Sequence, residues 1–256
     1  MKVINLNSRF ELTQAQIGFA ESVIICGEDE PIQKDDSISI LINEIPIFLV
    51  DTKTQEEYGN GDLLGFYQHS SKILGIEKPV VGLCLEKIIN EVNTDEELII
   101  LIAKVIIHEF AHAKMKLHPS AKYQPIDQFY EWMEEPMANL ITLEYFDKYD
   151  KGFNHKRYRK GDFAHVILQP NPIDFVKNFI SKQPDNYRLG LDLFNHRVWQ
   201  WWFWRNNKKD IQKMTKEKDT WLNYVKTNVG KTDEKTLNRL FNDLHNSQPI
   251  TKNKRH

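Results

Sequence analysis

The spacing of apolar residues changes repeatedly along this chain, and each spacing predicts a different element. Apolar positions from Thr13 to Gly27 suit an amphipathic helix, with Thr13 and Gln16 forming a box-like cap and Gly27 ending it. Residues 37–42 alternate between apolar and polar side chains and residues 45–50 form an apolar run, so both are predicted to be strands. Pro46 favours an edge position for the second strand, and residues 51–62 are predicted to form a polar loop.

Short apolar runs continue to residue 88, at residues 65–67, 72–76 and 80–88, and we expect a small sheet before the long apolar segment that follows. We expect residues 80–85 to form an edge strand of this sheet, because they lead most directly into the long apolar segment that follows.

The longest apolar stretch, residues 98–107, predicts a central helix that is packed on most sides. Thr94 can cap this helix, Glu97 can return a bond to the Thr94 amide, and the three acidic residues after Thr94 favour the positive end of the helix dipole. The helix should end near Leu117, because the next residue precedes a proline and is pushed away from helical dihedral angles. The stretch is too short, and interrupted too early by Lys104, to span a bilayer.

This helix carries the sequence His108-Glu109-Phe110-Ala111-His112 near its end. Two histidines four residues apart project from one face of a helix, one turn apart, where both rings can reach one zinc ion. Glu109 lies about 100° further round the helix, where a carboxylate can take a proton from a water beside the metal. A buried helix needs partners for these polar groups, and a metal supplies them. The pattern is therefore interpreted as the zinc-hydrolase motif HExxH.

A catalytic zinc usually takes three protein ligands and leaves one position open. Glu135 is the first candidate for the third ligand, and its neighbour Glu134 is the main competitor. His118 is a weaker candidate, because the residues around it leave the helix.

A second helix is predicted around Glu135. Proline fits the first turn of a helix, so Pro136 predicts a helix that begins between residues 132 and 135. Glu135 would then enter the metal site from the first turn, and Asn139, one turn later, could hydrogen-bond a ligand histidine.

HExxH followed by Glu-x-x-Ala-Asn on a second helix resembles the gluzincin metallopeptidases, and most of all the minimal zincins of the ImmA/IrrE type. The resemblance covers roughly residues 38–147, and residues 65–67, 72–76 and 80–88 resemble the short strands that these proteins place before the active-site helix. It implies an α+β fold with a zincin-like core, in which a small mixed sheet lies beside an active-site helix and a ligand helix. In such proteins an extended peptide can add to an edge strand beside the metal. By this likeness the zinc ligands are His108, His112 and Glu135. Glu109 corresponds to the general base, and Asn139 to the amide that supports a ligand.

Composition narrows the class of protein further. A chain of 256 residues can form one large domain, or a catalytic domain with a helical addition. The formal net charge of −2 gives no overall basic signature for nucleic acid, although residues 206–256 carry twelve Lys and Arg against six Asp and Glu. Cys26 and Cys84 form neither a disulfide framework nor a metal-binding pair, and both are expected to be buried thiols. Without a long apolar run near residue 1, the expected location is the cytoplasm.

The second half of the chain is predicted to be largely helical. We divide the sequence into a metallopeptidase core, residues 1–150, and a helical region packed on it, residues 151–256. Asn171-Pro172 and Gln183-Pro184 have the composition of helix starts. A tryptophan cluster in residues 199–204 fits core packing better than a binding wall, and residues 231–244 suit a last helix. Candidate donors to a reaction oxyanion in this half are His155, Arg157, Tyr158, His165 and His196.

These features predict a cytoplasmic zinc metalloendopeptidase that hydrolyses a protein or peptide substrate. Zn²⁺ would be held by His108, His112 and Glu135, and Glu109 would act as the general base. The alternative is a zinc-binding regulatory or sensor protein of the same fold with little turnover, against which the intact Glu109 argues. A toxin-like or self-processing factor, whose helical second half recognises one partner, remains open. Neither a membrane nor a nucleic acid is expected as a partner. The sequence does not predict whether the protein is a monomer or an oligomer.

Overall fold

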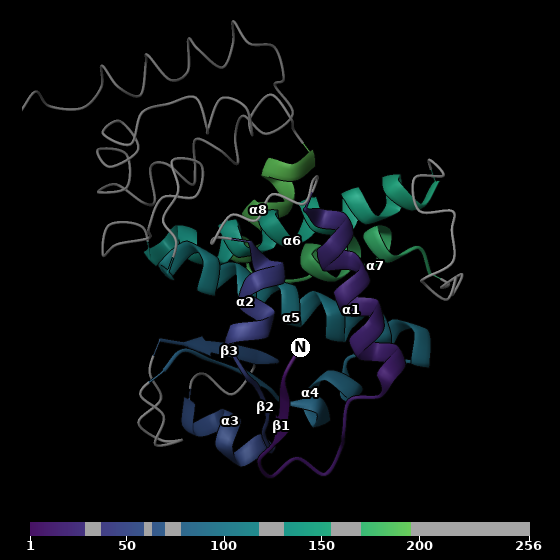
Figure 1. The fold of residues 1–256 in the computed structure, drawn as a ribbon. Helices are drawn as coiled ribbons and strands as arrows, with labels where there is room; N and C mark the ends of the chain where they lie inside the picture. Colours follow the sequence, from purple (N-terminus) through teal and green to yellow (C-terminus); the bar gives the residue numbers. More distant parts are fainter. Residues whose placement is uncertain (29–36, 59–62, 70–77, 118–130, 155–169, 196–256) are drawn as a thin grey trace, which may run out of the picture.

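The computed structural model describes residues 1–28, 37–58, 63–69, 78–117, 131–154 and 170–195 (Figure 1). This part of the chain is mostly helical with one small mixed sheet, in agreement with the expected α+β class. In chain order the elements are β1 (Val3–Asn5), α1 (Gln14–Gly27), α2 (Ile38–Glu44), β2 (Ile47–Leu49), α3 (Thr52–Tyr58), β3 (Gly65–Gln68), β4 (Val80–Leu83), α4 (Leu85–Asn90), α5 (Asp95–Leu117), α6 (Glu131–Asn154), α7 (Pro172–Ser181) and α8 (Asp185–Asn195).

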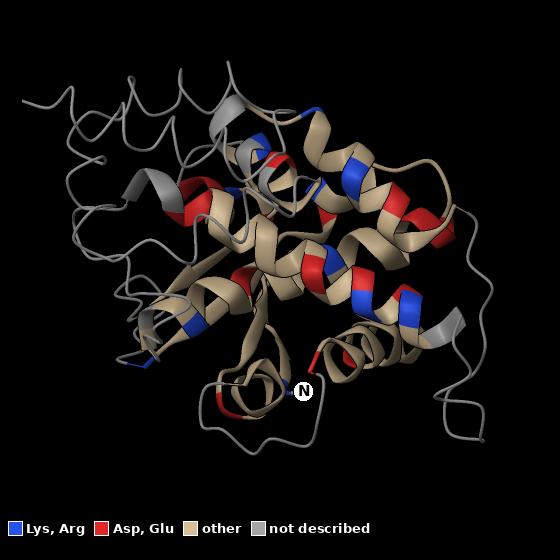
Figure 2. Ribbon diagram, turned by 90° about the horizontal axis from the view of Figure 1, so that it is seen from above, with Lys and Arg blue, Asp and Glu red and all other residues tan. Residues whose placement is uncertain are grey.

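The sheet has the order β1-β2-β4-β3. The first three strands in this order run parallel, and β3 pairs antiparallel with β4, with Phe66 opposite Gly82. None of these four strands contains a charged residue, and Figure 2 shows most of the acidic and basic positions on the helices. Uncharged strands of this kind are typical of a sheet that is covered on both faces.

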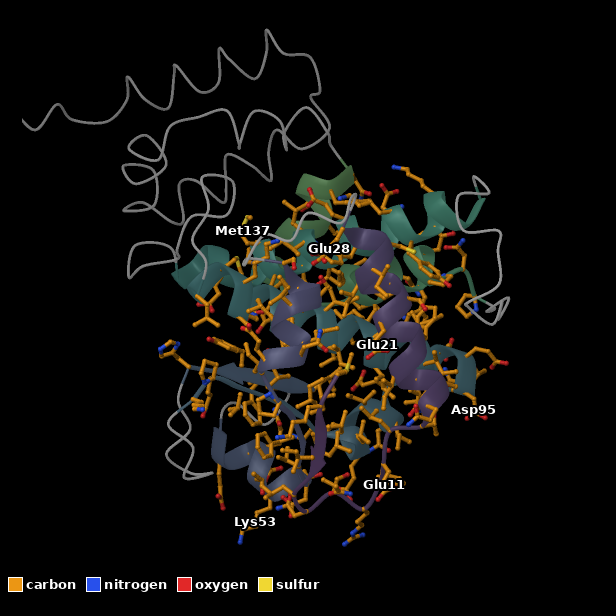
Figure 3. All side chains as sticks on the ribbon, viewed as in Figure 1. Glu11, Glu21, Glu28, Lys53, Asp95 and Met137 are labelled. Atoms are coloured by element: carbon orange, nitrogen blue, oxygen red, sulfur yellow. The ribbon has the colours of Figure 1, made fainter. Side chains whose placement is uncertain are left out.

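The two faces of the sheet bury different sets of side chains, because successive residues of a strand point to opposite faces. Ile47 and Leu49 of β2 join the main core, which lies between the sheet and the helical layer of α1, α2 and α5. Phe48 and Val80 belong to a smaller cluster on the opposite face, where α3 lies (Figure 1). Figure 3 shows side chains filling the space between the sheet and the helices.

Helix α5 runs through the middle of the molecule and is the predicted central helix. Its first turn is capped as expected, since the Thr94 hydroxyl accepts a hydrogen bond from the Glu97 amide at 3.1 Å. Glu97 returns its bond to the Asn93 amide, at 2.8 Å, one residue before the predicted one. The helix ends at Leu117, as predicted, and its apolar residues from Ile100 to Ile107 are buried in the main core.

Residues 38–44 form helix α2, so the strand predicted over 37–42 is wrong. The Ser37 hydroxyl caps the helix by accepting from the Ile40 amide. Ile38, Leu41 and Ile42 are buried at spacings of three and four residues, which is the helical pattern. The order of apolar and polar residues in this segment fits a strand, but the same order also gives a short helix one apolar face.

Residues 52–58 form helix α3, where a polar loop was predicted. Asp51 starts it, because its carboxylate accepts from the Thr54 amide at 2.8 Å and its carbonyl accepts from the Gln55 amide at 3.0 Å. Gln55 is fully buried, so one polar face of this helix packs inside the molecule. The remaining residues of the predicted loop, 59–62, and the predicted strand 72–76 lie outside the described residues.

The two predicted edge strands are both interior strands. β2 lies between β1 and β4, and β4 lies between β2 and β3. Pro46 is compatible with an interior strand because it precedes the first paired residue, Ile47, and its carbonyl accepts from the Val81 amide at 3.2 Å. Residues 85–88, which were also predicted to be strand, belong to helix α4. The edge strand beside α5 is β3.

Helices α6, α7 and α8 pack together on the α5 side of the molecule (Figure 1). Helix α6 begins at Glu131, so Pro136 lies inside it and not in its first turn as predicted. The carbonyl four residues earlier therefore lacks its usual helical donor. Gly190 of α8 packs directly on this segment, since a Cβ there would lie 2.4 Å from the Pro136 carbonyl oxygen.

The predicted helix starts at Asn171 and near Pro184 are confirmed by α7 and α8. Asn171 caps α7 by accepting from the amides of Ile173 and Asp174. No helix within the described ranges is both long and apolar enough to cross a bilayer. Cys84 is buried as expected, whereas Cys26 is partly exposed. The tryptophan cluster and the predicted last helix lie outside the described residues.

Candidate metal centre

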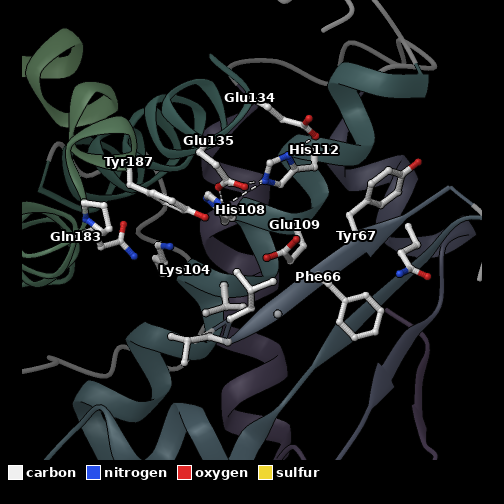
Figure 4. Close-up of a pocket in the computed structure, with 16 residues that line it drawn as sticks. Phe66, Tyr67, Lys104, His108, Glu109, His112, Glu134, Glu135, Gln183 and Tyr187 are labelled. Atoms are coloured by element: carbon white, nitrogen blue, oxygen red, sulfur yellow. Dashed lines mark hydrogen bonds and ion pairs between the residues drawn. The ribbon is translucent and has the colours of Figure 1, made fainter. Parts of the chain in front are cut away.

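The two motif histidines and the glutamate between them come from one turn of α5. His108, Glu109 and His112 are each only 5–6% exposed, although all three are polar. Burial of polar groups is costly unless they have partners. The partners come from α6, which crosses beside this turn and contributes Glu134 and Glu135 (Figure 4).

Three ligand atoms from these two helices converge on one point. The Nε2 atoms of His108 and His112 lie 3.2 Å apart. The Oε2 atom of Glu135 lies 3.0 Å from the first of them and 3.6 Å from the second. These three atoms, which we call the ligand triangle, form the group that could hold a metal ion, and they bring together all three ligands predicted from the sequence.

Glu134 lies on the other side of His112 and does not point into the triangle. Its Oε1 atom accepts a hydrogen bond from Nδ1 of His112 at 2.9 Å. A proton fixed on Nδ1 leaves the lone pair of a neutral imidazole on Nε2, which is the atom in the triangle. Glu134 thus orients the ring, in the manner of the carboxylate partners that metal-binding histidines usually have.

Asn139 does not hydrogen-bond a ligand histidine, contrary to the prediction. Its amide nitrogen donates to the Tyr187 carbonyl at 3.1 Å and to Oε1 of Gln183 at 3.4 Å, which ties α6 to α8. Its Oδ1 atom and Nδ1 of His108 are both buried without a partner among the described residues. Nδ1 of His108 therefore has no acceptor among the described residues that would orient the ring, in contrast to Nδ1 of His112.

Burial and neighbouring charges act in opposite directions on the triangle. Burial alone would lower the pKa of His112, but its bonds to Glu134 and Glu135 outweigh that effect and raise it to about 10. Burial, assisted by the charge of Lys104, lowers the pKa of His108 to about 4. Burial would raise the pKa of Glu135, but the two histidines hold it well below its ordinary range. These pKa values pair one ionised glutamate with one protonated histidine in the triangle.

Glu109 is the buried carboxylate nearest to the sheet. Burial raises its pKa to about 7, the range in which a group can both accept and release a proton. Gly65 of β3 lies against it, because a Cβ on Gly65 would be 3.2 Å from Cγ of Glu109 and 2.7 Å from Cγ1 of Val105. The strand approaches this turn of α5 so closely only because residue 65 has no side chain.

A pocket of about 480 Å³ opens beside the triangle, within the usual size range of ligand sites. Its walls come from β3, α5, α6 and the start of α8. At one end lie Lys104, Gln183 and Tyr187, and at the other end lies Tyr67 (Figure 4). Burial is the main reason that the pKa values of both tyrosines rise to about 12, so both hydroxyls remain protonated donors.

These pocket residues are the functional candidates that sequence reasoning missed. Lys104 carried a signal, because it is the single charged residue of the apolar run 98–107 and precedes His108 by four positions. Tyr187 and Gln183 carried none, since they are far from the motif in sequence. The earlier oxyanion candidates, residues 155, 157, 158, 165 and 196, and His118 lie outside the described residues.

The chain was compared with protein-family models, with curated proteins and with solved structures, and none of them matches it.

Proposed function

We propose that this protein is a zinc-dependent peptidase whose core resembles the minimal zincins. The observation that carries the proposal is the ligand triangle of His108, His112 and Glu135, with the buried carboxylate of Glu109 beside it in a pocket wall. This combination supplies three metal ligands and a base next to a space that can hold a substrate.

The donor set and its spacing fit zinc. A tetrahedral zinc with bonds of about 2.0–2.1 Å separates its ligand atoms by about 3.3 Å. The edges of the triangle, 3.2, 3.0 and 3.6 Å, are close to that value. Two imidazoles and one carboxylate are also the ligands of the His₂Glu class of catalytic zinc sites. When bound, zinc supplies a Lewis acid that polarises a substrate carbonyl and makes water more acidic.

Glu109 is proposed to act as the general base and then as the general acid. Its carboxylate takes a proton from the attacking water and later delivers that proton to the leaving amine. The pKa of about 7, caused by burial, suits both transfers near neutral pH. Gly65 keeps β3 close to Glu109, which limits the space that bulk water can occupy around it.

Tyr187 is proposed to donate to the oxyanion that forms as water attacks the carbonyl. Its hydroxyl points toward His108 and Glu135 in Figure 4. The hydroxyl stays protonated at neutral pH, because burial raises the pKa of Tyr187 to about 12. A fixed O–H donor beside the reacting carbonyl stabilises the charge that develops in the transition state.

β3 is the proposed place for the substrate backbone, replacing the edge strand that was predicted at residues 80–85. It pairs with β4 on one side, and no other described strand pairs with its second side. Leu64 directs its carbonyl to the Cys84 amide, so by alternation the N–H and C=O of Tyr67 point away from β4. An extended peptide can pair with such an edge, and β3 also lines the pocket.

The test is to compare wild-type protein with Glu109→Gln, using Glu96→Gln as the matched control. Glu96 is an exposed glutamate on the same helix. Newly formed peptide termini would be identified after incubation of each protein with a cell extract, and zinc content would be measured in parallel. Glu109→Gln should keep stoichiometric zinc and lose about 10²–10⁴-fold in cleavage rate, whereas Glu96→Gln should match wild type.

Equal cleavage by wild-type protein and Glu109→Gln would remove the proposed base. Stoichiometric zinc without any cleavage that depends on Glu109 would favour the alternative, a zinc-binding regulatory protein. Absence of zinc binding by the wild-type chain would remove both.

A further inference from the structure

Lys104 places a buried positive charge in the wall of the candidate active site. It lies one turn before His108 on the same face of α5, and only 4% of it is exposed. Every residue on either side of it from Ile100 to Ile107 is apolar and buried. Lysine is almost never buried this fully unless it is paired, so its charge calls for a partner.

No carboxylate among the described residues lies within ion-pair distance of the Lys104 ammonium, and no described acceptor hydrogen-bonds it. The ammonium lies over the ring of Phe179, whose centroid is 5.5 Å from Nζ. The charges of Glu109 and Glu135 act on Lys104 only from longer range, with burial as the dominant effect on its pKa. Both carboxylates already have roles, one beside the sheet and one in the ligand triangle.

Two more donors accompany Lys104 at the same end of the pocket. Gln183 uses its Oε1 atom to accept from Asn139, which leaves its Nε2 atom as the free end of the amide. Tyr187 adds a protonated hydroxyl. Figure 4 shows Gln183, Lys104 and Tyr187 together on one side of the ligand triangle. The ammonium and the amide N–H on this wall are complementary to an anion with several acceptor atoms, while the Tyr187 hydroxyl keeps its proposed role as donor to the oxyanion.

We propose that this end of the pocket binds a carboxylate of the peptide substrate, so that the enzyme cuts next to a negatively charged group. This inference rests on the proposed peptidase function. The short distance along α5 between Lys104 and His108 places the charge within one or two residues of the bond to be cut. The carboxylate has two possible sources, which are an acidic side chain and the carboxyl terminus of a peptide.

The experiment measures binding and cleavage separately with matched peptide pairs. The first arm uses a series of peptides that are blocked at both ends and carry one Glu, placed at a different position in each peptide. Each of these peptides is compared with the same peptide carrying Gln in place of Glu. In the second arm, the same peptide without acidic side chains is compared as a free acid and as an amide. Binding is measured by calorimetry on the zinc-loaded full-length Glu109→Gln protein, and kcat/KM is measured on wild type.

At least one pair should favour the carboxylate member by about tenfold or more, since a hydrogen bond to a charged group is worth about 1.5–3 kcal/mol. Lys104→Met should reduce that preference to less than twofold, and Lys104→Arg should keep most of it. The matched control is Lys177→Met, because Lys177 also lies over a phenylalanine ring, that of Phe194 at 5.3 Å, but does not line the pocket.

The outcomes separate this inference from the proposed function. Peptides that are cleaved without any preference for a carboxylate would overturn the Lys104 site and leave the peptidase intact. A preference in binding without any cleavage would support the site and count against the peptidase. A preference that persists unchanged in Lys104→Met, or no difference within any pair, would overturn the site. Where Lys104→Met fails to fold, the peptide pairs on the wild-type chain still test the carboxylate site, and a preference kept by Lys104→Arg still tests the need for a cation at position 104.

Discussion

At the scale of single residues, the adjacent carboxylates Glu134 and Glu135 have different surroundings. Glu135 faces the two Nε2 atoms of the ligand triangle, whereas Glu134 faces the outer nitrogen of His112. Consecutive residues of a helix are separated by about 100°, so the two side chains reach opposite sides of the same imidazole. One is placed to bind a metal, and the other to hold the ring that binds it.

Removing each carboxylate should therefore affect metal affinity to a different degree. Glu134→Ala should weaken binding by about 10–100-fold, because His112 loses the acceptor that fixes its ring. Glu135→Ala should weaken it more, because it removes one of three ligands. Competition with a chromogenic chelator measures both affinities at fixed pH. A greater loss of metal affinity for Glu134→Ala than for Glu135→Ala would mean that Glu134, and not Glu135, is the third metal ligand.

The sequence alone favoured Glu135 over its neighbour Glu134 as the third ligand, but it could not settle the choice. That choice depends on the rotational phase of α6 relative to α5, and Pro136 suggested a helix start one to four residues later than Glu131. His108, Glu109 and His112 were assigned more easily, because their mutual geometry follows from one helix. Local geometry is readable from a sequence, whereas the relative placement of two helices is not.

At the scale of elements, β3 and α5 are held closer together than side chains normally allow. A Cβ on Gly65 would lie 2.7 Å from Cγ1 of Val105, closer than side chains pack. The close approach brings the edge of the sheet to Glu109. A glycine at this position is thus required by packing, not by an unusual backbone conformation.

Gly65→Ala should move β3 away from α5. We expect a loss of about 1–3 kcal/mol in the free energy of unfolding, as for other overpacked sites, together with reduced cleavage and unchanged zinc content. Urea unfolding, a peptide assay and metal analysis measure the three quantities. The matched control is Gly18→Ala, since a Cβ at Gly18 meets nothing within 4 Å and alanine favours the helix. Full activity and full stability in Gly65→Ala would show that the contact is unimportant.

Elements with local signals were predicted better than elements that depend on their neighbours. The Thr94 cap, the acidic first turn and the end at Leu117 identified α5 correctly. The segment 37–42 has a pattern that suits a strand and a short amphipathic helix equally, and the Ser37 cap decides for the helix. The edge strand was wrong because strand order depends on pairings between distant segments, such as β2 with β4.

At the scale of the whole molecule, the pocket is assembled from parts that are distant in the chain. β3, α5, α6 and the residues before α8 each supply a wall. The HExxH motif predicts the chemistry of one wall only. Gly190 allows α8 to lie against the Pro136 segment of α6, and this contact carries Tyr187 toward the ligand triangle. The donors opposite the motif could therefore be found only in the folded structure.

A metal in the ligand triangle would join α5 to α6, and its binding should stabilise the whole fold. A ligand that binds only the folded state stabilises it by about 4 kcal/mol at a thousandfold excess over its dissociation constant. For a domain of this size each kcal/mol raises Tm by about 2–4 °C, so zinc should raise Tm by about 8 °C or more over the protein treated with chelator. Glu135→Ala, which lacks a ligand, should show little of this gain.

The gain in Tm should also increase with pH, because zinc and a proton compete for His112. A histidine must be neutral to bind a metal, and the pKa of about 10 keeps a proton on His112 of the metal-free protein. That raised pKa stabilises the metal-free fold fully below about pH 6.5, and the contribution is lost as pH rises toward 10. His108, with a pKa of about 4, releases no proton in this range.

Between pH 6 and pH 8, the difference in Tm between zinc-loaded and chelator-treated protein should therefore widen by about 3 °C per pH unit. Calorimetry in buffers of different ionisation enthalpy should find at least about one proton released per zinc at pH 7, because Glu109, with a pKa of about 7, can add to the proton of His112. A difference in Tm that narrows as pH rises, or zinc uptake without proton release, would contradict the pairing of His112 with Glu134 and Glu135 in the metal-free site.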